Sequence, residues 1–381
     1  ILRMDNCSMI VHDPSGEIAK AVITEKERQG YRCYCLNFGD PLHSIGYNFF
    51  KAIKVQADCN KLGTSVVKTN IKASGDDFWN LSAINVISVA ASYLKFCEPE
   101  EYQNLYNVRK LVGAIATDPE KVDALFAKAP DSILTEYRNI LANEPKVLNS
   151  IISTALSSLQ LVTDPDIAKL TSFHQIDFER IRTEKTIFFI QNSTMDSSYY
   201  KSLVSLIFEQ LFKQLTLKLS DRHELDVFFI IDEFSTLTLP TMPIFLANCR
   251  KYRIGCLNAV QSISQIIHSY GKDLCDSIVA NSLTRVFFSG LPLHDATYLE
   301  ALLGKVEHTD EQGKKQIMPL LNSEAIRTMS GDHIIIIHAS TKPILSLVTP
   351  YFKNFWLSKK IIKTEPRENL YLPESIPALP L

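Results

Sequence analysis

The fold of this 381-residue chain is decided by the stretch Val227-Phe-Phe-Ile-Ile-Asp232-Glu233. Five consecutive apolar residues are typical of a strand buried on both faces, as in a parallel sheet that helices cover on either side. Two adjacent carboxylates follow this strand directly. A catalytic carboxylate needs such a rigid support, because a displacement of about 1 Å can cost about a hundredfold in rate. The stretch predicts a central strand that carries an acidic site. The alternative is a strand that ends in a solvated acidic turn.

Apolar runs on either side of this stretch extend the pattern. Strand, helix and strand follow one another between Ser8 and Phe38, which is typical of a parallel sheet unit. A second helix is predicted from about Tyr199 to Leu219, because Leu203, Ile207, Leu211 and Leu215 recur at a spacing of four. We predict helices at residues 17–28 and 199–219, and strands of one sheet at 8–12, 31–38, 186–191, 227–231, 255–260, 284–289, 333–338 and 344–348.

Residues 77–170 have a different character. Apolar residues recur there with helical spacing, and prolines stand near the expected helix starts, where a missing N–H costs nothing. We predict an all-α insertion. The proline-rich, polar end of the chain is predicted to be a tail or linker. The predicted division is a first part of an α/β domain at 1–76, an all-α domain at 77–170, a second α/β part at 171–364 and a tail at 365–381.

Composition limits the classes of function. The net charge of −2 gives no overall attraction to nucleic acid, so any DNA contact must come from a local basic surface. No apolar run approaches the roughly 18 residues that span a bilayer, and we expect these residues to be soluble and cytoplasmic. The eight cysteines and nine histidines show no metal-ligand spacing, which favours buried, reduced thiols. Lys359, Lys360 and Lys363 fit a solvated helix face better than a DNA contact.

The acidic stretch and its downstream neighbours suit a nucleoside triphosphatase. There, Asp232 would lie near Mg²⁺ through water, and Glu233 would polarise the attacking water. Gln261 follows the next strand, where an amide can reach the γ-phosphate or its water. Arg250 stands at a helix end, from which it can stabilise transition-state charge in a neighbouring subunit. The plainer alternatives are a satisfied buried amide for Gln261 and a solvated helix C-terminus for Arg250.

An ordered series of motifs resembles the coupling proteins of type IV secretion and conjugation, the TraG/TraD-like family. The motifs that carry this resemblance are Ile10-Val-His-Asp-Pro-Ser-Gly-Glu17, the helical stretch opened by Phe78-Trp79, Asp232-Glu-Phe234, Leu239-Pro240, Cys249-Arg-Lys-Tyr252, Val260-Gln-Ser-Ile-Ser-Gln265, Tyr270-Gly271 and Ala280-Asn281 onward to Phe288-Ser-Gly290. The resemblance extends to about Phe352. It implies a RecA-like P-loop NTPase sheet with helices on both faces, interrupted by an all-α domain that recognises substrate.

The resemblance also implies a site and a set of partners. ATP and Mg²⁺ would be the cofactors, with Asp232, Asp13, Gly16 and Glu17 in nucleotide and metal binding. Glu233, Gln261 and Arg250 would be catalytic. A homo-hexamer on the cytoplasmic face of the bacterial inner membrane is implied, held there by N-terminal segments outside this sequence. It would move single-stranded DNA with its relaxase, or an effector protein, to the secretion channel.

Two departures from the family pattern bear on these expectations. Ser15 stands where many members have lysine, which removes a positive charge. No Gly-x-x-x-x-Gly-Lys-Ser/Thr occurs in the 381 residues, although that loop cradles the phosphates in the family. We therefore expect a fragment that begins downstream of the loop and has little activity alone. Two alternatives remain open at this stage: a double-stranded DNA translocase of the segregation type, and a substrate adaptor without hydrolysis.

Overall fold

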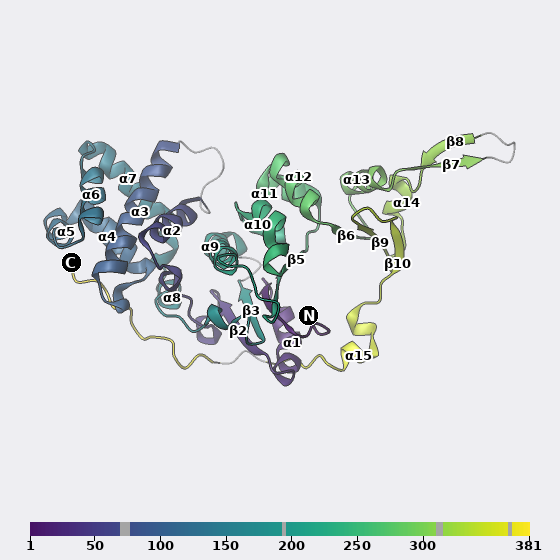
Figure 1. The fold of residues 1–381 in the computed structure, drawn as a ribbon, viewed down its shortest axis with the longest axis horizontal. Coiled ribbons are helices and arrows are strands. Elements are labelled where there is room, and N and C mark those ends of the chain that lie inside the picture. Colours follow the sequence, from purple (N-terminus) through teal and green to yellow (C-terminus); the bar gives the residue numbers. More distant parts are fainter. Residues whose placement is uncertain (69–76, 193–195, 310–314, 365–367) are drawn as a thin grey trace.

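A parallel sheet forms the centre of the protein (Figure 1). We describe a computed structural model, in which residues 1–68, 77–192, 196–309, 315–364 and 368–381 are placed well enough to be described. The strand order is β2-β3-β1-β4-β5, and all pairings are parallel. The strands are β1 (Cys7–His12), β2 (Arg32–Asn37), β3 (Thr186–Gln191), β4 (Asp226–Ile231) and β5 (Ile254–Asn258). The predicted parallel arrangement of these five strands is confirmed.

Helices cover both faces of this sheet. On one face, Ile10 of β1 and Phe229 of β4 belong to the large core that also buries the stripe of helix α9 (Ser197–Leu215). On the other face, Met9 and Val11 pack with Ala19 and Val22 of helix α1 (Glu17–Arg28). Because both faces are covered, every residue of β1 and β3 is buried. The apolar stripe of α9, with its spacing of four, thus packs on one face of the apolar strands.

The residues from 77 to 170 are helical wherever they form regular structure, as predicted. The helices are α3 (Asp77–Cys97), α4 (Leu105–Thr117), α5 (Pro119–Phe126), α6 (Asp131–Leu141), α7 (Pro145–Ser158) and α8 (Pro165–Leu170), with the 3₁₀ turns η3 (Glu100–Tyr102) and η4 (Gln160–Thr163). Pro119, Pro145 and Pro165 each occupy the first turn of their helix, where no N–H is needed. The preceding helix α2 (Gln56–Lys68) packs closely on α3, since a Cβ at Gly63 would lie 2.5 Å from Ser88 Oγ.

The three later apolar runs do not extend the parallel sheet, and that prediction is wrong. They form a separate antiparallel sheet in the order β10-β9-β6. Its strands are β6 (Thr284–Phe288), β9 (His333–His338) and β10 (Ile344–Leu347). One face of this sheet packs on helices α13 (Leu293–Leu303) and α14 (Ser323–Arg327) through Phe287 and Ile335, whereas Val286 and Phe288 are exposed. An apolar run alone does not specify its pairing partner, so the sequence pattern could not separate the two sheets.

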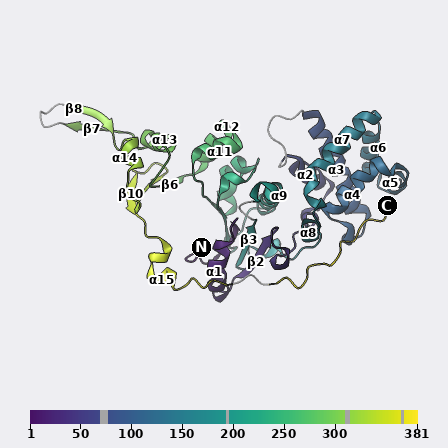
Figure 2. The ribbon, with the colours of Figure 1, turned by 180° about the vertical axis from the view of Figure 1, so that it is seen from behind.

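The remaining elements complete the two ends of the molecule. Helices α10 (Met242–Asn248), α11 (Ile263–Tyr270) and α12 (Lys272–Asn281) lie beside the parallel sheet, and strands β7 (Lys305–Thr309) and β8 (Lys315–Pro319) form a projecting hairpin. Figures 1 and 2 place the helices α3 to α7 at one end and the antiparallel sheet at the other. After helix α15 (Phe355–Ser358), the chain returns along the molecule to the helical end.

The last residues are attached rather than loose where the structure describes them. Leu379 is buried, its N–H donates to Asn107 Oδ1, and Asn107 Nδ2 donates to the carbonyl of Pro377. Lys110 of α4 donates to the carbonyl of Leu379. Within the described residues, no helix has the length and hydropathy of a membrane span.

Candidate functional site

Asp232 and Glu233 lie at the carboxyl end of β4, as the sequence predicts. Strand pairing continues past them: the N–H of Asp232 donates to the carbonyl of His12 at 3.2 Å, and the N–H of Phe234 donates to that of Ala259 at 2.9 Å. Both carboxylates belong to half-buried residues between the ends of β1 and β5. The neighbouring strands therefore fix the backbone from which both carboxylates project.

Glu233 has a left-handed backbone, with φ 51° and ψ 47°. This conformation costs a residue with a Cβ about 1–2 kcal/mol, so surrounding bonds must hold it. Its carbonyl accepts from the N–H of Thr236 at 2.9 Å and from Thr236 Oγ1 at 2.8 Å. Its own N–H donates to Asp232 Oδ1 at 3.1 Å. The turn thus directs two successive carboxylates from one strand end.

A fully buried histidine supports this turn. His12 Nδ1 lies 2.6 Å from the carbonyl oxygen of Asp232, and Nε2 lies 3.3 Å from Asn192 Oδ1. Phe208 of α9 contacts the imidazole edge to face, with ring centroids 6.0 Å apart. Burial lowers the pKa of His12, although the bonds to Asp232 and Asn192 oppose this, so the ring is neutral near pH 7. The sequence analysis placed His12 in a motif but assigned it no role, and it missed Asn192. The available signal was a polar side chain at or just after the end of an apolar strand.

Asp13 is engaged with the start of helix α1. Its two carboxylate oxygens accept from the N–H groups of Ile18 and Ala19, at 3.3 and 2.7 Å. Burial raises the pKa of Asp13, and these N–H bonds act in the opposite direction. Gly16 has φ 72°, and a Cβ there would approach Gln191 Nε2 to 3.4 Å, whereas Glu17 is exposed. Asp13 therefore lies near Asp232 at the carboxyl end of β1, whereas Gly16 faces the end of β3.

Gln261 lies beyond the end of β5, next to the acidic turn. Its Oε1 accepts from Gln265 Nε2 at 3.3 Å, and Gln265 Oε1 accepts from Ser235 Oγ at 3.0 Å. The Gln261 side chain is exposed, so the buried-amide alternative does not hold. The structure brings Gln261 and Glu233 to the same sheet edge.

Arg250 lies at the other edge of the sheet. It belongs to the 3₁₀ turn η7 (Cys249–Tyr252) that precedes β5, and it is exposed. Nearby, Arg253 binds Asp226 at the start of β4, with Nε and Oδ1 2.7 Å apart. β4 and β5 run parallel, and Arg250 precedes β5 whereas Glu233 follows β4. The two residues of one chain are therefore separated by the length of a strand and do not form a common site.

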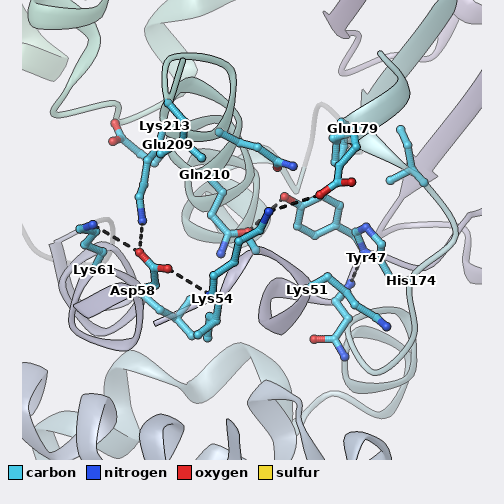
Figure 3. Close-up of a pocket in the computed structure, with 18 of the residues that line it drawn as sticks. Tyr47, Lys51, Lys54, Asp58, Lys61, His174, Glu179, Glu209, Gln210 and Lys213 are labelled. Carbon is cyan, nitrogen blue, oxygen red and sulfur yellow. Dashed lines mark hydrogen bonds and ion pairs between the residues drawn. The ribbon is translucent and has the colours of Figure 1, made fainter. Parts of the chain in front are cut away.

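Among the cavities between described residues, two near the parallel sheet lie outside the acidic turn itself. One of about 590 Å³ borders the carboxyl ends of β1 to β3 and is lined by residues that include Ser15, Gly16 and Gln191. Another of about 460 Å³ lies between α9 and the segment leading into α2 (Figure 3). In the part of the chain that the structure describes, no group of three metal-ligating side chains occurs. The paired carboxylates suit a magnesium ion held through water, but the sequence contains no Gly-x-x-x-x-Gly-Lys-Ser/Thr loop to cradle a triphosphate.

The sheet order, the covered faces and the acidic end of a central strand define a RecA-like P-loop NTPase fold. A family model described as "Type IV secretory system Conjugative DNA transfer" matches residues 1–377. This chain belongs to that family of coupling proteins for conjugative DNA transfer.

Solved structures agree on the fold. The bacterial conjugative coupling protein TrwB, in its unbound monoclinic form, is similar with a TM-score of 0.70 and 16% identity over 90% of this chain and 78% of that chain. TrwB with ADP and Mg²⁺ has a TM-score of 0.65 and 15% identity over 90% and 85%. VirB4 of Thermoanaerobacter pseudethanolicus has a TM-score of 0.50 and 10% identity over 93% and 92%. The comparison with curated proteins gives no significant match.

Proposed function

We propose that this chain is the ATPase part of a type IV secretion coupling protein, which couples hydrolysis to transfer of single-stranded DNA with its relaxase, or of an effector protein. The family match supports this proposal, as do structures of TrwB in complex with a non-hydrolysable ATP analogue and with ADP and Mg²⁺. The single observation that carries it is the pair Asp232 and Glu233 on a rigid turn beside Gln261.

Each residue has a distinct part in this proposal. Magnesium-bound ATP, when present, supplies the phosphoryl group that water attacks. Asp232 holds a metal-bound water, and Glu233 orients and polarises the attacking water. Gln261 contacts the γ-phosphate or that water. Arg250 acts on the site of a neighbouring copy, because it lies at the opposite edge of its own sheet.

The nucleotide site also needs residues around the acidic turn. Asp13, Gly16 and Glu17 contribute the border of the site on the β1 side. The 381 residues contain no Gly-x-x-x-x-Gly-Lys-Ser/Thr, the type of loop whose backbone N–H groups cradle phosphates. These 381 residues alone are therefore expected to bind nucleotide weakly.

The assembly we propose is a homo-hexamer at the cytoplasmic face of the bacterial inner membrane, anchored by segments outside this sequence. The helical part, residues 77–170, recognises cargo and delivers it to the secretion channel. The family description supports a DNA cargo. With a net charge of −2, the DNA contact must be a local basic surface of the ring.

The test is ATP hydrolysis by the complete gene product, with and without single-stranded DNA, over a range of protein concentrations. We expect turnover to rise with concentration and with DNA, because sites are completed between subunits. Glu233→Gln keeps the size of the side chain and removes its charge, so we expect a loss of at least about a hundredfold in kcat with little change in ATP binding.

The control is Glu324→Gln, which makes the same chemical change at an exposed position of helix α14, away from the acidic turn. A folded, assembled wild type without hydrolysis would contradict the motor and favour a substrate adaptor. Equal stimulation by double-stranded DNA would instead favour a translocase of the segregation type.

A further inference from the structure

His12 satisfies both main-chain polar groups of Asp232. The N–H of Asp232 donates to the carbonyl of His12, at 3.2 Å, and His12 Nδ1 donates to the carbonyl of Asp232, at 2.6 Å. A carbonyl oxygen only accepts, so Nδ1 carries the proton of the neutral ring. The free lone pair is then on Nε2, which faces the carboxamide of Asn192, and this group donates when its nitrogen is turned toward the ring.

The bond from His12 acts on the peptide group that joins the two carboxylate residues. The oxygen of this peptide accepts from His12, and its N–H, which belongs to Glu233, donates to Asp232 Oδ1. The plane of the peptide is therefore held at both ends. Its orientation determines where Asp232 Oδ1 lies. It also fixes the plane from which Glu233 turns into its left-handed conformation.

The imidazole itself has little freedom. His12 is completely buried at the end of β1, which pairs with β3 on one side and β4 on the other. Phe208 packs against one side of the ring, and Asn192 bonds to its far nitrogen. A donor so fixed restrains its acceptor, in contrast to an exposed side chain, which would follow the movements of the turn.

We propose that His12 is a positioning residue: through its bond to the Asp232 carbonyl it holds Asp232 and Glu233 in the geometry needed for water activation. This inference rests on the proposed ATPase function. His12 touches neither substrate nor metal in this role, and it exchanges no proton during the reaction.

Two near-isosteric substitutions separate the two bonds of the ring. In His12→Asn the amide nitrogen takes the place of Nδ1, so the bond to Asp232 is kept and the bond to Asn192 is lost. In His12→Gln the amide lies near the position of Nε2, so the bond to Asn192 is kept and the bond to Asp232 is lost. His12→Leu fills the site without any donor.

The measurement is kcat and KM for ATP of the complete gene product, together with thermal unfolding. We expect His12→Asn to retain kcat within about threefold, and His12→Gln and His12→Leu to lower kcat by roughly ten- to a hundredfold at nearly unchanged KM. Amide hydrogen exchange of the segment around Asp232–Leu237 in nucleotide-free protein should be faster in the Gln and Leu variants and unchanged in the Asn variant.

The outcomes separate this inference from the proposed function. If Glu233→Gln abolishes hydrolysis while His12→Leu matches wild type in kcat and in exchange, the positioning role is overturned and the ATPase stands. If Asn and Gln variants lose kcat and melting temperature equally, His12 is a packing residue only, and the inference is again wrong. If Glu233→Gln has no effect, the proposed function itself fails, and the exchange data alone still decide whether His12 restrains the turn.

Discussion

At the scale of single residues, the environment of His174 fixes its charge. His174 lines the cavity of Figure 3, and its Nδ1 accepts from the N–H of Asn48 at 3.1 Å. Burial, with a smaller contribution from the Lys51 ammonium, lowers the pKa of His174 to about 4. The folded protein therefore keeps this ring neutral at a pH where the unfolded chain, with a pKa near 6.5, binds a proton.

This difference predicts the pH dependence of folding. As pH falls from about 6.5 to about 4, His174 binds a proton in the unfolded state but not in the folded state. The free energy of unfolding of the wild type should therefore fall by an amount on the order of 2 kcal/mol. His174→Asn keeps an acceptor for the N–H of Asn48 and has no titrating ring. The free energy of unfolding of this variant should therefore change less with pH over this range. Urea unfolding at several pH values measures both. His268→Asn, at an exposed position of α11, is the matched control, and parallel curves for all three proteins would contradict the prediction.

At the scale of elements, helix α9 joins the sheet to the helical layer. Its Lys213 Nζ lies 2.5 Å from Asp58 Oδ1 of α2, and its Glu209 accepts from Thr241 just before α10. Burial would raise the pKa of Asp58, but the bonds from Lys213 and from the N–H groups of Lys54 and Val55 together lower it. Figure 3 shows Lys213 and Lys61 both reaching this carboxylate.

The ion pair between α9 and α2 should be measurable. A double-mutant cycle with Lys213→Met and Asp58→Asn should give a coupling of about 1 kcal/mol in urea unfolding at pH 7, since Lys213 is partly exposed. Because the folded pKa of Asp58 is depressed, the coupling should be complete above about pH 4 and disappear as Asp58 is protonated in more acidic solution. Strictly additive single-mutant effects at pH 7 would contradict this.

The elements also show how far the sequence could predict the structure. Continuous apolar runs identified β1 and β3, which are buried on both faces, and a spacing of four identified α9, which is buried along one stripe. The apolar run of β4 also marked a strand, but buried and half-buried residues alternate along it, so one of its faces is less covered than the sequence predicts. The pairing of β6 with β9 left no such pattern in the sequence, because a run of apolar residues does not specify which strand it pairs with. Asp232, Glu233 and Gln261 were all placed at strand ends from the sequence, whereas the left-handed backbone of Glu233 was not foreseen, because the bonds with Asp232 and Thr236 that accompany it appear only in the folded turn.

At the scale of the whole molecule, the C-terminal segment connects the two ends. It leaves the antiparallel sheet, passes α1 and β2, and ends against α4 (Figures 1 and 2). On the way, Asn369 Nδ2 donates to the carbonyl of Ser44, and at the end Leu379 is 1% exposed. Leu379 is the buried apolar residue of this stretch, and the half-buried Leu372 and Leu381 also pack on the core, so Leu379 is the main apolar anchor of the last residues.

Removing that anchor should release the end of the chain. Leu379→Ala leaves an unfilled site, and the lost contacts of about 2 kcal/mol or more should increase limited proteolysis after Asn369 at least tenfold. Leu370→Ala is the matched control in the same segment, because Leu370 is 86% exposed. Equal cleavage of both variants at the wild-type rate would show that Leu379 is not the anchor.

The position of β1 in the sheet has a consequence for biosynthesis. The Ser8 hydroxyl of β1 donates to the carbonyl of Glu184 just before β3, 176 residues further along the chain. At 5–20 residues per second, a ribosome needs roughly 10 to 35 s to make that partner. During this time the helices α3 to α8 emerge and can fold locally, while the apolar β1 segment has neither β3 nor β4 to pair with. We expect the nascent chain to need a chaperone over this first segment until β3 and β4 have left the exit tunnel.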